Sequence, residues 1–401
     1  MSNRILFVAS LAAMAAVSSV AFAEDAPAPA PAAAPAAPAA PTGPTLAKVL
    51  DASGLVVTSY IDLAYDHANR NIESSGTSDR VFDSQNDSLS LHQVGLQIAK
   101  QPKEGFGGLV NFTAGTDVPV IASYPSSGGQ FDVTQAFGQY ASGEWTVIAG
   151  KFTTLQGTEV IWAPSNNNFS RSILFGAIPF THTGMRVTYA LSDTVSLIAG
   201  INNGWDQVSS ASKSKTGEFA VTLNPIKPLN ITISDYVGNA STVVGGGSYT
   251  GEKTGVRNSA NVVASYAITD AASVGVEYLM VSQSNFISLV DGSTIKAKYD
   301  GEAVYGSYLF TPAWRLALRA ESFNDKDGFH FGSPDTKYTE VTATVSWLAS
   351  DNFELRGEVR EDHGSHSIFV SSGSTLAAVV AGSSTPNKNL LTLGIEALFK
   401  F

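Results

Sequence analysis

The carboxy-terminal segment has the pattern of a β-strand that continues to the last residue. Residues 389–401 read NLLTLGIEALFKF, and the apolar residues that share one face are Leu391, Leu393, Ile395, Ala397, Phe399 and Phe401. Strict alternation is typical of a strand with one buried face. A strand in a soluble sandwich is one interpretation, but the ends of soluble domains usually fray into water. A transmembrane β-barrel explains the pattern better, because its last strand pairs with its first and turns one face to lipid.

The amino-terminal region differs in composition from the rest of the chain. Residues 1–23 combine a basic residue, Arg4, with an apolar run and a small-x-small exit at Ala21–Ala23, the layout of a cleavable secretory signal. Residues 24–50 are rich in alanine and proline, which favours an extended periplasmic spacer. We therefore expect a signal peptide over 1–23, a spacer over 24–50 and a barrel over 51–401.

The composition excludes several classes of protein. Cysteine is absent, which excludes disulfides, a thiol nucleophile and a thiolate metal site. Acidic residues outnumber basic ones by 35 to 24, whereas nucleic-acid binding requires a basic surface, so we expect no nucleic-acid partner. Charged residues make up only 15% of the chain, which suits a barrel that turns half of its strand residues toward lipid.

Alternating segments between turn residues predict sixteen strands. Seven short connections alternate with eight long ones rich in glycine, serine and asparagine, as at the periplasmic and extracellular ends of outer-membrane barrels. In the second strand, Leu89 and Leu91 are out of phase with Val94, which predicts a β-bulge near Gln93. The predicted fold class is therefore all-β, a transmembrane antiparallel β-barrel of about 16 strands.

Charged residues within the predicted strands fall on one face. In the segment 353–360 every second residue is charged, and the residues between them are Phe353, Leu355, Gly357 and Val359. A lysine or arginine facing lipid at mid-depth costs about 2 to 4 kcal/mol, so these charges should face the lumen. We expect a charged ladder made of Arg186, Arg315, Arg319, Glu340, Glu354, Arg356, Glu358 and Arg360. The ladder either sets ion selectivity or holds charges that only pair with one another.

The third long connection, Thr153 to His182, is unusually apolar for a solvent-facing loop. Long loops of this kind are usually functional or packed against something. We expect it to fold toward the lumen as a constriction, with its apolar side chains against the wall. The residues expected near the opening are Glu159, Asn166, Asn168, Arg171 and His182. The alternative is an extracellular cap that lies over the mouth of the barrel.

Several motifs in and around this connection resemble those of a known family. They are GKFTTLQGTE (150–159), NNNFSRSILFG (166–176), PFTHTGMR (179–186) and NNGWD (202–206), with GFGGLVNFTAG at 105–115. The chain resembles the β-barrel porin-2 (OmpL-like) family from about residue 54 to residue 401. The resemblance implies an outer-membrane porin of a Gram-negative bacterium, but it indicates no particular solute.

The expected function is passive diffusion of ions and small hydrophilic solutes through a water-filled, loop-constricted barrel, which requires no cofactor and no metal. The alternative is a structural or adhesive surface barrel with a plugged lumen. An enzymatic or metal-binding interpretation would use the group Asp362, His363, Ser365, His366 and Ser367, and a metal site could add His330. It is disfavoured because this group lies in a predicted extracellular loop and a zinc site needs three or more converging ligands.

The expected partners follow from this interpretation. They are outer-membrane lipid, the transported solutes and the outer-membrane assembly machinery, for which Phe399 and Phe401 resemble an insertion signal. A homotrimer is expected by analogy with general porins. Small residues let membrane surfaces approach closely, and the candidate contact positions are Gly108, Ala114, Ala260 and Ala264.

Overall fold

The computed structural model describes residues 46–69, 80–85, 87–125, 129–210, 213–241, 254–369 and 387–401. The predicted signal peptide over 1–23 and the predicted spacer up to residue 45 lie outside the described residues. Residues 46–50 begin a short helix, α1 (Leu46–Ser53), which the sequence analysis did not predict. Among the described helices, none has the length and apolar character needed to cross a membrane.

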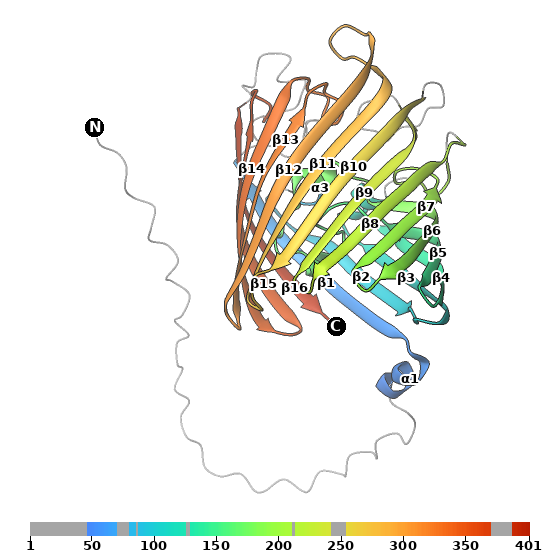
Figure 1. Ribbon diagram of the computed structural model, residues 1–401. Coiled ribbons are helices and arrows are strands. Elements are labelled where there is room, and N and C mark those ends of the chain that lie inside the picture. Colours follow the sequence, from blue (N-terminus) through green and yellow to red (C-terminus); the bar gives the residue numbers. More distant parts are fainter. Residues whose placement is uncertain are drawn as a thin grey trace, which may run out of the picture. The chain divides into compact units, whose positions relative to one another are not determined.

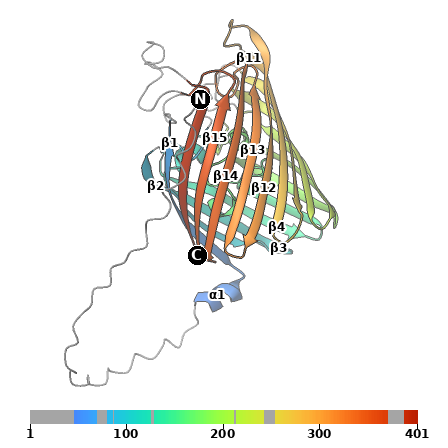
Figure 2. The same cartoon turned by 90° about the vertical axis from the view of Figure 1, so that its left-hand side faces the viewer.

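Sixteen antiparallel strands in the described part of the chain form a closed barrel in which each strand pairs with its sequence neighbours and β1 pairs with β16 (Figures 1 and 2). The predicted fold class is confirmed. The strands are β1 Val56–Ala68, β2 Ser88–Lys100, β3 Gly105–Ala114, β4 Phe131–Ser142, β5 Trp145–Thr153, β6 Thr181–Ser192, β7 Val195–Asn202, β8 Thr216–Ile226, β9 Leu229–Ser241, β10 Thr254–Ala267, β11 Ala272–Ile287, β12 Thr294–Thr311, β13 Trp314–Asp325, β14 Thr336–Ser350, β15 Phe353–Gly364 and β16 Asn389–Lys400. The short helices are α2 (Val118–Ile121), a 3-10 turn (Ala163–Ser165) and α3 (Ile173–Gly176).

The last strand closes the barrel as its alternation predicts. In the β1–β16 pair, Leu63 lies opposite Ala397 and Ile61 opposite Phe399. The terminal residue continues the ladder, because the Phe401 amide donates to the Ser59 carbonyl at 2.8 Å and the Ser59 amide donates to the Phe401 carbonyl at 3.1 Å. Backbone groups at the end of the chain are therefore paired, as membrane-spanning structure requires.

The two ends of the barrel differ in the length of the connections between strands. Seven connections, each of two to four residues, lie at one end and alternate with eight longer ones. The β11–β12 connection is the shortest of the eight, because β11 reaches Ile287 and β12 begins at Thr294. Aromatic residues that the sequence places at the short-turn end are Phe106, Trp145, Phe310, Trp314, Trp347, Phe353 and Phe399. Such a girdle is where amphipathic rings meet the membrane interface.

The predicted β-bulge in β2 is confirmed. Asp62 pairs with Gln93, but the next residue of β1, Leu63, pairs with Leu91, so His92 is the extra residue. The bulge restores the phase of the strand, since both Leu91 and Val94 are then exposed on the outer face.

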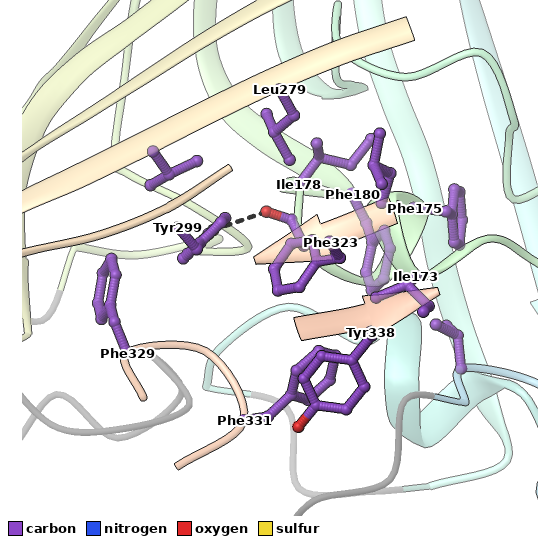
Figure 3. Packing of buried hydrophobic residues seen from close by; sticks show 14 of the residues in the cluster. Ile173, Phe175, Ile178, Phe180, Leu279, Tyr299, Phe323, Phe329, Phe331 and Tyr338 are labelled. Atoms are coloured by element: carbon purple, nitrogen blue, oxygen red, sulfur yellow. Dashed lines mark hydrogen bonds between the residues drawn. The ribbon is translucent and has the colours of Figure 1, made fainter. Parts of the chain in front are cut away.

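A hydrophobic core lies on the inner side of β11–β14 (Figure 3). It joins α3 and the residues after it to inward-facing side chains of these strands and to the β13–β14 connection. Tyr299 of β12 donates a hydrogen bond from its hydroxyl to the Ala177 carbonyl at 2.7 Å. The buried residues that Figure 3 labels are Ile173, Phe175, Ile178, Phe180, Leu279, Tyr299, Phe323, Phe329, Phe331 and Tyr338.

Candidate functional site

The charged ladder lies on the inward face of the barrel wall and is heavily paired. Arg319 and Arg356 are 1% and 0% exposed, although both are arginines of a wide barrel. The paired groups, with their separations, are Arg319 and Glu340 (3.0 Å), Arg356 and Glu396 (2.9 Å), Arg356 and Glu354 (2.7 Å), Arg360 and Asp362 (2.7 Å), and Arg186 and Glu218 (2.6 Å). Arg315 also pairs with Glu354. Three of these acids, Glu218, Asp362 and Glu396, were not among the residues predicted for the ladder.

The segment between β5 and β6, residues 154–180, bonds to the same wall. It has at least one hydrogen bond to each strand from β9 to β15. Three ladder arginines donate to it: Arg319 to the Ser170 carbonyl (2.8 Å), Arg356 to the Asn166 carbonyl (2.7 Å) and Arg360 to the Arg171 carbonyl (2.5 Å). Arg319 also pairs with Glu159 of the segment at 2.7 Å. These contacts join the segment and the wall into one polar network.

Carboxylates of the wall accept from backbone amides of the segment. Glu358 accepts from Phe169 and Ser170 at 2.7 and 3.0 Å, and Glu321 accepts from Ile173 and Leu174 at 2.7 and 3.1 Å. The Ser172 side chain accepts from the Phe175 amide at 3.0 Å. The free amides at the start of α3 are thus satisfied by Glu321 and Ser172, as a buried helix end requires.

The predicted constriction residues separate into two groups. Glu159, Asn166 and Asn168 line a cavity of about 310 Å³. Arg171 instead donates to the Phe169 carbonyl at 2.7 Å and is buried, and His182 stacks on Tyr236 at a ring separation of 4.4 Å. The structure therefore does not bring these five residues to one opening.

A second cavity, of about 320 Å³, lies between the segment and strands β1–β5. Its strand residues are Thr58, Gln97, Asn111, Thr134, Gln135 and Thr153, and its segment residues are Val160, Ile161, Trp162 and Ser165. All ten side chains are uncharged. Ser165 lines both cavities and is exposed, so it marks a point where the segment faces open space.

A buried polar group near the β2 bulge was missed by the sequence analysis. His92 lies 3.0 Å from Asp117 (Nδ1 to Oδ1), and Asp62 and Asp66 of β1 are buried on the same inward face. The alternation of Tyr60, Asp62 and Asp66 with apolar residues could have indicated an acidic inner face. It could not have indicated that the bulge brings His92 to it.

The residues of the predicted alternative site do not converge on one point, although the Ser365 hydroxyl lies 3.2 Å from Nδ1 of the neighbouring His366. Asp362 faces inward and pairs with Arg360, whereas His363 is exposed and contacts Asn389. Within the described ranges, no group of three or more histidine, aspartate or glutamate side chains could hold a metal ion.

The family model described as "Putative beta-barrel porin-2, OmpL-like" matches residues 54–401. The chain belongs to this family. It is accordingly a porin-like barrel of a Gram-negative outer membrane, and the resemblance seen in its motifs is confirmed. No curated protein matches the sequence.

Solved outer-membrane structures share the fold. The outer-membrane channel DcaP of Acinetobacter baumannii has a TM-score of 0.56 at 17% identity, with 87% of this chain and 98% of that chain covered. OprB of Pseudomonas putida has a TM-score of 0.58 at 12% identity, with 88% and 96% covered. An anion-selective porin from Comamonas acidovorans has a TM-score of 0.54 at 12% identity, with 86% and 99% covered. At these identities the similarity is one of fold alone.

Proposed function

We propose that this porin lets ions and small hydrophilic solutes diffuse passively, and that residues 154–180 lie inside the barrel and narrow its lumen. The observation that carries the proposal is the network between this segment and inward-facing residues of β9–β15. The segment reaches inner-face groups on seven consecutive strands, from Tyr236 of β9 to Glu358 of β15. A barrel of about sixteen strands leaves an aqueous channel unless something occupies it.

The proposed passage runs between the segment and strands β1–β5. The opposite side is occupied by the hydrophobic core and the charged network, in which Arg319, Arg356 and Arg360 are almost fully buried. The cavity beside β1–β5 is lined by hydroxyl, amide and apolar groups. Selectivity in channels comes from the groups that line the narrow part. We therefore propose a weakly ion-selective passage, in which the ladder holds the segment and does not line the opening.

A plugged structural barrel is the second candidate, and the hydrophobic core favours it. If the segment closed the lumen completely, the long connections would serve as binding surfaces. Single-channel conductance in planar bilayers separates the two functions, because a plugged barrel passes no current. We infer no catalytic role and no cofactor, since diffusion needs only a lumen and a constriction.

Labelling of an introduced cysteine tests the constriction. The chain has no cysteine, so Ser165→Cys places one thiol at the proposed narrow point. A bulky charged thiol reagent should then reduce single-channel conductance several-fold. The control is Ser293→Cys, on the exposed β11–β12 connection, where the same label should leave conductance unchanged. Complete labelling of Ser165→Cys with unchanged conductance would place the narrow point elsewhere.

The outward face of β9–β10 is the proposed contact between subunits of a homo-oligomer. Asp235 of β9 faces outward, and the Asn258 side chain donates to its two carboxylate oxygens at 2.8 and 3.0 Å. Asp235 lies six residues beyond Leu229, the first residue of β9. At about 3.3 Å per residue this is about 20 Å along a tilted strand, so Asp235 lies within the apolar band, which is about 25 Å tall. A carboxylate at that depth is costly in lipid and favours a protein contact. Ala260 lies opposite Asp235, and Ala264 lies farther along β10, opposite Ile231. Gly108 and Ala114 remain a second candidate surface.

A further inference from the structure

Five uncharged polar side chains form a row across the inner wall from β1 to β5, and all five line the cavity beside these strands. Thr58 lies opposite Gln97, Gln97 opposite Asn111, and Asn111 opposite Gln135. The Oε1 atom of Gln135 accepts from the amide and the hydroxyl of Thr153 at 3.3 and 3.4 Å. Residues directly opposite each other in antiparallel strands share a face of the sheet. These five residues, the polar row, therefore run across the proposed passage.

The polar row differs from the carboxamides near it on the same wall. Gln101 donates to Gln139 at 3.1 Å, and Gln93 donates to Asp117 at 2.8 Å, so these amides are used within the protein. Asn111 is 2% exposed, yet its Nδ2 has no hydrogen-bond partner among the described residues. A buried donor of this kind is costly unless water or a solute supplies an acceptor. The polar row thus offers a hydrogen bond to whatever occupies the cavity.

The segment 154–180 supplies the other side of the cavity. Trp162 is half-buried, with its ring 4.4 Å from that of Tyr60, and Ser165 is exposed. None of the ten lining side chains is charged. An organic ion that sheds its water here gains no opposite charge in return, which is costly. The lining therefore favours neutral solutes over charged ones of similar size.

We propose that the polar row binds neutral polyhydroxylated solutes, such as monosaccharides, as they pass. This inference rests on the proposed passage beside β1–β5. Each solute hydroxyl both donates and accepts, and a carboxamide offers both functions in return. The C–H groups of a sugar ring can pack on the apolar surface of Trp162. The cavity volume of about 320 Å³ lies within the range of small-molecule sites, about 300 to 1,000 Å³.

Solute entry into proteoliposomes that contain the full chain tests the inference. Entry of labelled glucose should saturate with concentration, whereas entry of triethylene glycol, which has hydroxyls only at its ends, should rise linearly. Gln97→Met with Asn111→Leu removes two amides at similar side-chain volume, and the glucose concentration at half-saturation should rise about tenfold. Asn111→Ser keeps one hydroxyl and should give an intermediate value. Asn230→Leu is the matched control, because this carboxamide of β9 bonds to Asn224 outside the cavity lining and its loss should change nothing.

The possible failures are distinguishable. Linear entry of glucose, equal curves for the two solutes, or a half-saturation that the double variant leaves unchanged would overturn the role of the polar row, while ion current through the parent would leave passive diffusion in place. An equal loss with Asn230→Leu would also overturn it, because the effect would then not belong to the cavity. A parent that passes neither ions nor solutes would overturn the proposed passage, and this inference with it. Circular dichroism of each variant establishes that the barrel has folded.

Discussion

Arg319 joins the wall to the segment 154–180, so its removal should release the segment. Its guanidinium bonds to Glu340 (3.0 Å), to Glu159 (2.7 Å), to the Ser170 carbonyl (2.8 Å) and to the Ser170 hydroxyl (3.0 Å). In Arg319→Met, Glu159 loses its buried cationic partner, whereas Glu340 keeps Arg360 at 3.9 Å. Removal of one member of a buried ion pair typically costs about 3 to 5 kcal/mol, because the remaining charge is left uncompensated.

The cost falls on the docked state of the segment more than on the barrel. The barrel is held by its own backbone ladders, whereas Glu159 can return to water if the segment detaches. At about 1.4 kcal/mol per tenfold, the predicted loss changes the docking equilibrium by a factor of about 100 or more. In planar bilayers we expect Arg319→Met to show larger, noisier currents, and limited proteolysis should cut within 154–180. Barrel content by circular dichroism should stay unchanged.

Arg315→Met is the matched control. Arg315 lies on the same strand and pairs with Glu354, but it is closer to the short-turn end, partly exposed, and hydrogen-bonded within the wall to Glu354 and Ser346. Glu354 keeps Arg356 and Lys400 as partners when Arg315 is removed, and the contacts of Arg315 named above stay within the wall, so the currents should match those of the parent. A second variant, Arg319→Met with Glu159→Gln and Glu340→Gln, should recover much of the docking. Quiet, unchanged currents from Arg319→Met would refute the assignment of this arginine as the link.

Three further predictions follow from the fold and the proposed passage. Phe401→Asp should lower the amount of inserted protein, measured in membrane fractions, because a charge replaces the exposed apolar ring at the end of the last strand. The conductance of inserted molecules should stay the same, and altered conductance with normal insertion would contradict this. In a salt gradient the reversal potential should be small and change little in Arg315→Met, which leaves the segment docked, since the cavity beside β1–β5 is uncharged. A strong shift would place this arginine in the passage. Ala260→Trp should reduce cross-linked oligomers in mild detergent, whereas Val341→Trp, on the outward face of β14, should not; equal yields from both would remove β9–β10 as the contact.

The barrel could be predicted because the alternation that identifies each strand involves only residues that are close in the sequence. Each strand residue faces either lipid or the interior, so a period of two is imposed over the whole strand, as in β16. The bulge at Gln93 was visible for the same reason, because two leucines changed phase within one strand. Helix α1 was missed, since it follows directly on an Ala/Pro tract that was interpreted as extended.

The contacts of the candidate site could not be predicted, because they join residues far apart in the chain. Alternation showed that Arg319 faces inward, but not that Glu159 of another segment would meet it. A signal for the hydrophobic core did exist in β11. Leu279 and Val281 are apolar and face inward, while Tyr278 and Met280 face outward, so this strand is apolar on both faces. In a barrel with a wet lumen, such a strand indicates that something apolar packs inside.

The segment 154–180 is held to the wall by two kinds of contact, apolar packing and hydrogen bonds to charged side chains. Its second part, around α3, buries apolar side chains against β11–β14, which no polar wall could hold. Its first part has backbone groups that lie outside any helix or strand. The wall supplies partners for them, Glu277 for the Thr158 amide, Glu358 for the Phe169 amide and Arg356 for the Asn166 carbonyl. Buried backbone groups without partners are costly, so charged side chains on the inner wall of this barrel are required by the segment they hold. Their presence alone is thus weak support for ion selectivity, and an uncharged passage beside them is physically consistent.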